Sequence, residues 1–302
     1  MLSPIIVIIN ASAGADDRQD FVKKLEETFQ AAGVDAQLVQ AQSGASIRDA
    51  VQHAVQKRPQ AIVAGGSDGT LNAVATALVG TDIALGVLPM GTLNHFAKDL
   101  KIPLDLEEAV RTIIAGHTIK VDVGKVNERY FLNNSSLGIY PRIVRDREQQ
   151  QRSGRHKWVA FFWAVLAVLR RHAFMSVLLE ANGREGIRRT PFVFVGNNEY
   201  QMEGFNLGTR SCMNAGQLSV YSLKKTGRWA LLHLALRSLF GRLRQSRDFD
   251  AFCAPEVRIE SHHKHMLIAT DGEVTRMTLP LHYQVQAGAL RVIVTEGEEC
   301  AR

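Results

Sequence analysis

Two turns of this sequence carry residue types that bind phosphate groups. The first runs from Gly65 to Thr70 and the second from Pro89 to Asn94, and each follows a short apolar run. A glycine-rich turn before a helix exposes backbone N–H groups, which together with the helix dipole favour an anion. Thr70 and Thr92 add hydroxyl donors, whereas the Asp68 carboxylate repels phosphate unless it holds Mg²⁺, accepts N–H bonds or pairs with a base.

A plainer interpretation is a pair of ordinary strand-to-helix turns, because one glycine turn alone is weak evidence. Two successive turns with glycine and threonine in matching places favour the binding interpretation. The sequence contains no G-x-x-x-x-G-K-[ST] motif, which excludes a Walker-type P-loop, and the turns lack the G-x-G-x-x-G pattern of a dinucleotide fold.

A third turn, Thr270 to Glu273, contains two carboxylates next to a glycine and follows the apolar run Met266 to Ala269. By itself Asp-Gly is typical of a tight hairpin turn. A positioned carboxylate could also take the proton from an alcohol that attacks phosphorus.

The elements that must position these turns fall into two groups. In the first 116 residues, apolar runs alternate with helical periodicity, which predicts a parallel sheet flanked by helices. After Lys120, alternating apolar and polar residues predict a β-rich sandwich. We therefore expect domains at 1–124 and 125–302, with the last segment returning to the first domain. The last two strands are predicted at Thr278 to Gln286 and Leu290 to Val294, and Ser46 is the predicted cap of a helix that ends at Lys57.

Composition limits the class of protein. The chain has 302 residues, of which 46% are hydrophobic and 22% charged, which suits a packed core. Three widely spaced cysteines, Cys212, Cys253 and Cys300, fit neither a zinc site nor a disulfide framework and suit a reducing cytosol. We expect no signal peptide, because the apolar start of the sequence has no basic n-region and no cleavage site. We also expect no transmembrane helix, because no apolar run reaches about 18 residues.

The net charge of +6 is unevenly distributed. Between Arg142 and His172 eight basic residues oppose two acidic ones, and between Lys224 and Arg247 seven oppose none. Both segments contain an amphipathic helical pattern, at 156–172 and 229–243, which fits either packing on the protein or contact with lipid phosphates. We expect an anionic membrane surface as partner and no nucleic acid, because stacking aromatics are not interleaved with the basic residues.

The turns resemble a known family. GGSDGTLN (65–72) and PMGTLNHFAKDL (89–100) resemble two signature blocks of the diacylglycerol kinase catalytic-domain family, and Asp271-Gly272-Glu273 resembles a third. This family includes bacterial lipid kinases and sphingosine kinases and is related to NAD kinases. Asn94, Phe96 and Ala97 favour the lipid branch. The resemblance implies an NAD kinase/diacylglycerol kinase-like α/β domain followed by a β-sandwich.

The resemblance also implies the roles of the turns. Asp271 is the preferred general base, with Glu273 left open as the alternative, and Asp68 would orient a Mg²⁺ ion bound to ATP. The implied ATP-binding residues are Asn10, Gly14, Gly65, Gly66, Ser67, Asp68, Gly69, Thr70, Asn72, Gly91, Thr92 and Asn94.

Some positions depart from the family pattern. Ser67 replaces a glycine, which would be costly if that position required a positive φ angle. Asn214 and Ala215 replace two aspartates, so we expect an additional structural Mg²⁺ site to be absent or weak.

The sequence therefore predicts an ATP- and Mg²⁺-dependent lipid kinase of phospholipid metabolism, cytoplasmic and peripherally attached to a membrane. Its acceptor would be the hydroxyl of diacylglycerol, a sphingoid base or a related glycerolipid. Two alternatives are a soluble NAD kinase-like enzyme and a degenerate nucleotide- or lipid-binding module without turnover. The identity of the lipid and the oligomeric state, including a homodimer, are left open.

Overall fold

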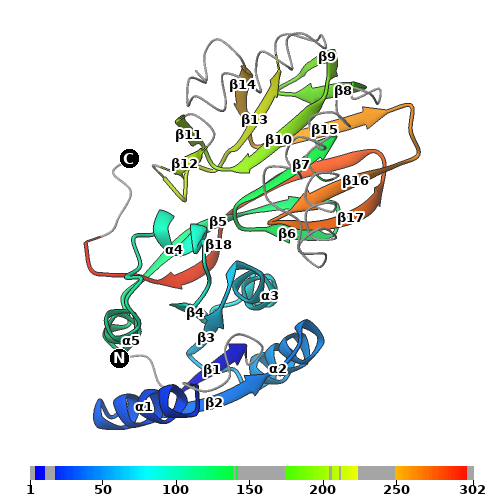
Figure 1. Cartoon of the computed structure of the whole chain (residues 1–302). Coiled ribbons are helices and arrows are strands. Elements are labelled where there is room, and N and C mark those ends of the chain that lie inside the picture. The colour runs from blue at the N-terminus through cyan, green and yellow to red at the C-terminus, as the bar shows by residue number, and fades with distance from the viewer. Residues whose placement is uncertain are drawn as a thin grey trace, which may run out of the picture. The chain divides into compact units, whose positions relative to one another are not determined.

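The computed structural model describes residues 4–10, 18–138, 141, 174–203, 206–210, 212–223 and 249–297. The chain divides into two compact units (Figure 1). Unit 1 comprises Met1–Val123, Cys212–Asn214 and Gln286–Arg302, and unit 2 comprises Gly124–Ser211 and Ala215–Val285. Gly14 and the two basic helical patterns at 156–172 and 229–243 lie outside the described residues.

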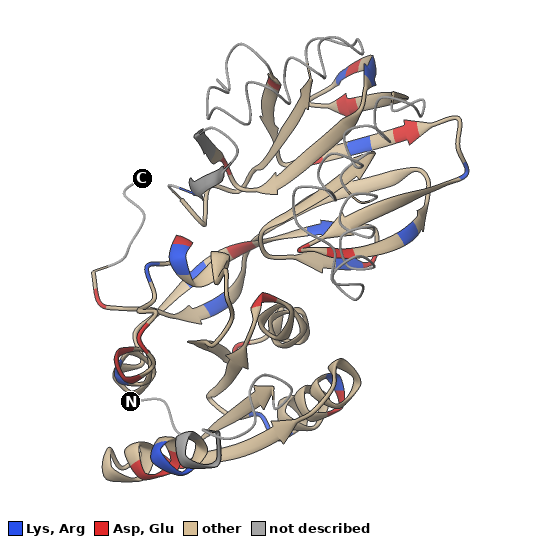
Figure 2. Ribbon diagram, viewed as in Figure 1, with Lys and Arg blue, Asp and Glu red and all other residues tan. Residues whose placement is uncertain are grey.

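Unit 1 is an α/β domain in which four strands and their helices alternate. Its elements are β1 (Ile5–Asn10), α1 (Arg18–Ala31), β2 (Ala36–Ala41), α2 (Gly44–Gln56), β3 (Ala61–Gly66), α3 (Asp68–Leu78), β4 (Ala84–Pro89), α4 (His95–Asp99) and α5 (Leu106–Ala115). The sheet order is β2-β1-β3-β4, and all neighbours are parallel. Buried parallel strands read as continuous apolar runs, and Figure 2 shows no charged residue on β1, β3 or β4. The predicted parallel sheet is confirmed.

Local hydrogen bonds set the helix boundaries in unit 1. The N-cap of α2 is Ser43, whose hydroxyl accepts from the Ser46 N–H while the Ser46 hydroxyl accepts from the Ser43 N–H. The prediction that Ser46 is the cap was therefore wrong, because Ser46 is the second half of a reciprocal capping box. Helix α5 begins after Asp105, which accepts from two backbone N–H groups, and ends at Gly116 with φ 72°.

Unit 2 is an antiparallel β domain. Its strands, two of them shared with unit 1, are β5 (Thr118–Val126), β6 (Arg129–Phe131), β7 (Asn134–Gly138), β8 (Met175–Ala181), β9 (Arg184–Thr190), β10 (Phe192–Asn197), β11 (Tyr200–Glu203), β12 (Asn206–Arg210), β13 (Leu218–Leu223), β14 (Phe249–Ala254), β15 (Glu256–Ser261), β16 (His265–Thr270), β17 (Glu273–Thr278) and β18 (Leu281–Ile293). One sheet has the order β14-β13-β10-β7-β16-β17. In unit 2 a second layer runs β18-β15-β8-β9, and the two layers share one apolar core. The predicted sandwich is confirmed.

Strand β18 differs from the prediction. The sequence predicts two strands here, but one strand runs from Leu281 to Ile293 and belongs to unit 2 up to Val285 and to unit 1 from Gln286. Its last part is parallel to β4, with Val292 beside Leu85. Gly288 at φ 58° interrupted the alternating pattern without ending the strand. Within the described residues, no helix is long and apolar enough to cross a bilayer.

Candidate functional site

The two glycine turns predicted from the sequence leave neighbouring strands at the same edge of the unit 1 sheet. Gly65 pairs with Leu88 and Gly66 with Pro89 in the parallel register of β3 and β4. A Cβ atom on Gly91 would lie 2.9 Å from Ser67 Cα, so the turns pack directly against each other. The structure therefore brings both predicted turns to one place. Ligands of open α/β sheets bind at this carboxyl edge.

The first turn of α3 presents backbone donors. Asp68, Gly69 and Thr70 are its first residues, so their N–H groups have no partner within the helix. Ser67 is the N-cap, but its side chain makes no capping bond, and no other acceptor in the described part of the chain binds these N–H groups. Ser67 and Gly69 are exposed. This helix start can accept an anion such as a phosphate group.

Ser67 fits its place without strain. Its φ angle is −80° and its ψ angle is 172°, an extended conformation that any residue adopts. Space explains the glycine before it, because a Cβ atom on Gly66 would lie 2.7 Å from Thr70 Oγ1. The departure from the family glycine at position 67 therefore carries no conformational cost.

Asn10, at the end of β1, holds the threonine of the first turn. Its Nδ2 donates to Thr70 Oγ1 over 3.0 Å, and Thr70 is buried. This bond links the carboxyl end of β1 to the first turn of α3, the helix that follows the neighbouring strand β3. Asn10 therefore lies at the predicted site.

The side chain of Asn94 stabilises the second turn by hydrogen bonds to the backbone of the turn itself. Asn94 has a left-handed backbone, with φ 50° and ψ 45°, which asparagine tolerates better than most residues. Its Oδ1 accepts from the Gly91 N–H over 3.0 Å, and its Nδ2 donates to the Gly91 carbonyl over 2.8 Å. Thr92, in the same turn, is exposed.

Two buried oxygen atoms on α3 lack a partner in the described part of the chain. They are Asp68 Oδ1 and Asn72 Oδ1, four residues apart and therefore on one face of the helix. A buried acceptor without a donor is costly, which points to a missing donor or cation. A cavity of about 10 Å³, enough for about one water molecule, is lined by Asp68, Ser67 and Asn94 among others.

An oxygen donor set of this kind fits Mg²⁺, which prefers oxygen ligands and usually keeps waters or phosphate oxygens in its shell. No group of three or more His, Cys, Asp or Glu side chains in the described ranges could hold a metal by itself. Asp68 and Asn72 would therefore suit a cation whose other ligands are phosphate oxygens.

The third turn lies in unit 2 and joins β16 to β17. Thr270 pairs with Glu273, and the two residues between them have positive φ angles, 46° at Asp271 and 87° at Gly272. Two positive φ angles in a two-residue loop define a type I′ hairpin turn, for which Asp-Gly is a preferred sequence. The hairpin that Asp-Gly predicts is therefore present.

Both oxygens of the Asp271 carboxylate accept hydrogen bonds from backbone N–H groups. Its Oδ2 accepts from the Leu132 N–H over 2.7 Å, and its Oδ1 accepts from the N–H groups of Asn133 and Asn134, each over 2.9 Å. The residue is half-buried, while the carboxylate is enclosed by these donors. Burial raises the pKa of Asp271, whereas the three N–H groups and the charge of Arg210 lower it. The carboxylate ties the hairpin turn to residues 132–134.

The Glu273 carboxylate is exposed, with a side-chain exposure of 61%. Arg129 Nη2 lies 3.2 Å from its Oε2, and Arg129 Nη1 donates to Thr275 Oγ1 over 2.8 Å. An exposed pair of this kind contributes only about 0–1 kcal/mol to stability, but it orients the carboxylate. Glu273 is therefore oriented and open to solvent, whereas Asp271 is enclosed.

Sequence reasoning missed the residues that support the third turn. Arg129, Arg210 and the segment 132–134 are separated from Asp271 by 61 residues or more. No local pattern marks them, because each contact depends on how β6, β7, β12 and β16 are arranged. The burial of Arg210 marks it in the structure, but burial is not visible in the sequence.

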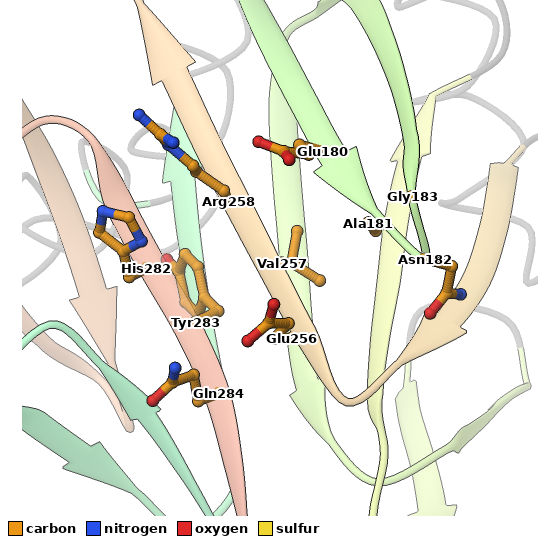
Figure 3. Close-up of a pocket in the computed structure, with 10 residues that line it drawn as sticks. All are labelled: Glu180, Ala181, Asn182, Gly183, Glu256, Val257, Arg258, His282, Tyr283 and Gln284. Carbon is orange, nitrogen blue, oxygen red and sulfur yellow. The ribbon is translucent and has the colours of Figure 1, made fainter.

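A separate pocket of about 240 Å³ opens on unit 2 (Figure 3). It is lined by residues of β8, β15 and β18 and of the turn after β8: Glu180, Ala181, Asn182, Gly183, Glu256, Val257, Arg258, His282, Tyr283 and Gln284. None of the residues predicted from the sequence lines this pocket, so it is not part of the candidate site.

Comparison with known proteins gives two family matches. Residues 4–126 match the diacylglycerol kinase catalytic domain, and residues 138–294 match the YegS C-terminal NAD kinase beta sandwich-like domain. The second match covers more than half of the chain, and the two together span both units.

Similar sequences carry names of lipid kinases. A "Probable lipid kinase YegS-like" protein of Serratia proteamaculans is 28% identical over 279 residues, 90% of this chain and 88% of that protein. A protein of the same name from Klebsiella pneumoniae is 34% identical, over 49% of this chain and 50% of its own length. A "Diacylglycerol kinase" of Staphylococcus carnosus is 32% identical over 44% of each chain. The last two alignments thus span half or less of those relatives.

Solved structures share the fold. A diacylglycerol kinase from Bacillus anthracis superposes with a TM-score of 0.71 at 21% identity, covering 99% of both chains. Yeast NADH kinase superposes with a TM-score of 0.55 at 9% identity, covering 99% of this chain and 85% of that one. At these identities the likeness concerns the fold alone.

Proposed function

Because this chain belongs to the family that joins a diacylglycerol kinase catalytic domain to a YegS-type C-terminal β-sandwich, we propose that it is an ATP-dependent lipid kinase. It would transfer the γ-phosphate of ATP to a hydroxyl group of a membrane lipid such as diacylglycerol, a sphingoid base or a related glycerolipid. The observation that carries the proposal is the open helix start of α3, packed against the β4 turn at the carboxyl edge of the sheet.

Unit 1 would bind the nucleotide. The N–H groups of Asp68, Gly69 and Thr70 would receive phosphate oxygens, and the exposed Thr92 hydroxyl would add a donor from the second turn. The predicted contact of Gly14 lies outside the described residues. Asp68 and Asn72 would hold Mg²⁺, which when bound would neutralise charge on the phosphates.

Unit 2 would supply the group that receives the proton of the lipid hydroxyl. The sequence favours Asp271, with Glu273 as the alternative, and the contacts support a proposal in which Glu273 takes this role. Asp271 is committed to three backbone N–H groups, whereas Glu273 is exposed and oriented by Arg129. A base must reach the proton that it abstracts. We therefore assign proton acceptance to Glu273 and the shape of the turn to Asp271.

The partner in this proposal is a membrane that presents its lipid to a peripherally attached, cytoplasmic enzyme. The basic segments at 142–172 and 224–247 support it through their charge, since clusters of Lys and Arg near apolar residues attract anionic lipids. The names of the relatives favour a lipid acceptor over the small soluble acceptor of an NAD kinase.

The test is transfer of label from γ-labelled ATP with Mg²⁺ into a panel of lipids in mixed micelles, with NAD⁺ as a soluble acceptor in parallel. We expect label in one lipid class, and a rate of labelling that is at least about 100-fold lower with Glu273→Gln. The matched control is Glu260→Gln. Like Glu273, Glu260 is a solvent-accessible glutamate of unit 2 that pairs with an arginine. Label in NAD⁺ alone would establish the soluble alternative, and ATP binding without any transfer would establish a binding module.

A further inference from the structure

We propose that Arg210 is a positioning residue for phosphoryl transfer, because it fixes the loop 132–134 on which Asp271 and the turn before Glu273 depend. The inference rests on the proposed function. Arg210 touches none of the predicted site side chains in the contacts described above, and the family signatures in the sequence do not include it. Its role follows from a chain of contacts inside unit 2.

The guanidinium of Arg210 is buried and bound to the loop. Arg210 is 4% exposed. Its Nη1 donates to the Leu132 carbonyl over 2.6 Å and to the Asn197 carbonyl over 3.1 Å, and its Nη2 donates to Asn133 Oδ1 over 2.8 Å. The guanidinium also lies 5.2 Å from the centre of the Tyr200 ring. One planar group therefore fixes both the main chain and a side chain of the loop.

The opposite edge of the same loop binds Asp271. Leu132 donates its N–H to Asp271 while its carbonyl accepts from Arg210, so one residue carries both contacts. Asn133 does the same, with its N–H on Asp271 and its side-chain oxygen on Arg210. Asn197 supports the arrangement, because its Nδ2 donates to the Leu132 carbonyl over 3.0 Å. The loop is held between a cation and an anion.

The turn transmits this position to Glu273. Asp271 also donates its own N–H to the Asn134 carbonyl over 2.9 Å, so its main chain and its side chain are both fixed to the loop. Only Gly272 separates Asp271 from Glu273, and a type I′ turn leaves little freedom between them. A shift of the loop would therefore displace the Glu273 carboxylate.

Lysine would not replace this arginine. An ammonium group is a point donor, whereas the guanidinium holds several acceptors in one plane and stacks on an aromatic ring. The charge of Arg210 also lowers the pKa of Asp271, which favours the ionised form that accepts three N–H groups.

The first experiment compares Arg210→Met with a control variant, Arg258→Met. Arg258 belongs to the same unit and pairs with Glu260, and both side chains are partly exposed. We expect Arg210→Met to lower kcat by about 100-fold, because a misplacement of about 1 Å can cost that much. The KM for ATP should stay within about twofold, since the nucleotide turns belong to unit 1, and Arg258→Met should leave both constants unchanged.

A merely structural role would also change stability, so two further measurements isolate positioning. In a double-mutant cycle, Asp271→Asn combined with Arg210→Met should be no slower than the slower single variant, because both act through one loop. Millimolar guanidinium should restore part of the kcat of Arg210→Gly and none to Glu273→Gln. An unchanged kcat in Arg210→Met, or additive effects in the cycle, would overturn the inference.

Two measurements keep the inference testable if Arg210→Met fails to fold or if the proposed function is wrong. Asn133→Ala removes only one acceptor of the guanidinium and should lower kcat several-fold while the protein stays folded. Amide hydrogen exchange at 132–134 needs no activity, and it should be faster in Arg210→Lys than in wild type. Unchanged exchange would reject the loop contact itself, whereas faster exchange in a chain without kinase activity would reject only the proposed function.

Discussion

The dipeptide Asp-Gly occurs in two turns of the molecule, and its hydrogen bonding differs between them. In unit 1, Asp68 and Gly69 begin α3, their N–H groups are open, and Asp68 Oδ1 has no partner in the described residues. In unit 2, Asp271 and Gly272 form a hairpin turn with positive φ angles, and the Asp271 carboxylate holds three N–H groups. The first turn therefore leaves donors for a ligand, and the second uses a carboxylate to satisfy the protein's own donors.

The difference comes from the surrounding elements. After β3, the chain enters a helix whose cap side chain is not used, so the first N–H groups remain available. After β16, the chain reverses directly into β17 beside the loop 132–134, whose N–H groups need an acceptor. The same two residues thus begin a helix in one place and form a hairpin turn in the other.

The largest effect is expected from Glu273→Gln, which removes the proposed proton acceptor but keeps the size of the side chain. General base catalysis contributes about 10²- to 10⁴-fold, so kcat should fall within that range while the melting temperature and the KM for ATP stay unchanged. Steady-state kinetics measures this, with Glu260→Gln as control. A larger loss in Asp271→Asn than in Glu273→Gln would return the base to Asp271.

Gly91→Ala tests the contact between the two glycine turns of unit 1. Its Cβ atom would lie 2.9 Å from Ser67 Cα and 2.8 Å from Asn94 Oδ1, so the turns must move apart. We expect a loss of about 1–3 kcal/mol in the free energy of unfolding and a higher KM for ATP. Gly69→Ala is the matched control, because its nearest neighbour would be 4.0 Å away. Equal destabilisation by both variants would contradict the packed arrangement.

Asp271→Asn and Asp68→Asn should change stability differently, which tests the comparison most directly. In Asp271→Asn the three N–H groups that bind the carboxylate would be left with weaker acceptors. The free energy of unfolding should therefore fall by about 1–3 kcal/mol. Asp68 has a buried oxygen without a partner among the residues that the structure describes, so its replacement should cost little or nothing. Urea unfolding of both variants measures the difference, and similar losses would refute it.

Asp68→Asn should act on the metal instead. Removing one negative charge from an oxygen donor set weakens Mg²⁺ binding, so more Mg²⁺ should be needed for half-maximal rate. A titration of activity against Mg²⁺ at saturating ATP checks this, with Asp82→Asn as a control on an exposed aspartate of the same unit. An unchanged titration curve would remove Asp68 from the proposed metal site.

The smallest effect is expected from Ser67→Gly, which restores the glycine of the family pattern. Ser67 has an extended backbone and makes no capping bond, and serine-to-glycine changes at an N-cap cost only a few tenths of a kcal/mol. The free energy of unfolding should therefore change by less than about 0.5 kcal/mol. A clear gain in stability would show that serine is strained at this position.

The sequence was sufficient for features that local residues encode. Buried apolar runs of unit 1 predicted its parallel strands, and Asp-Gly at 271–272 predicted the hairpin turn. Contacts between distant residues could not be predicted, because Arg210 reaches Leu132 only through the arrangement of the sheet. The charged segment Arg184–Thr190 was likewise missed as a strand, since β9 pairs with β8 at the end of its layer and carries mostly exposed side chains.

Strand β18 ties the completion of the unit 1 sheet to the order of protein synthesis. The strand that extends the unit 1 sheet beyond β4 is translated only after all of unit 2. Until then β4 lacks its β18 neighbour, and an unpaired strand edge can pair with other chains. A fragment that ends near residue 123 would keep that open edge and should aggregate. The sheet of unit 1 therefore includes a strand that an N-terminal half alone would lack.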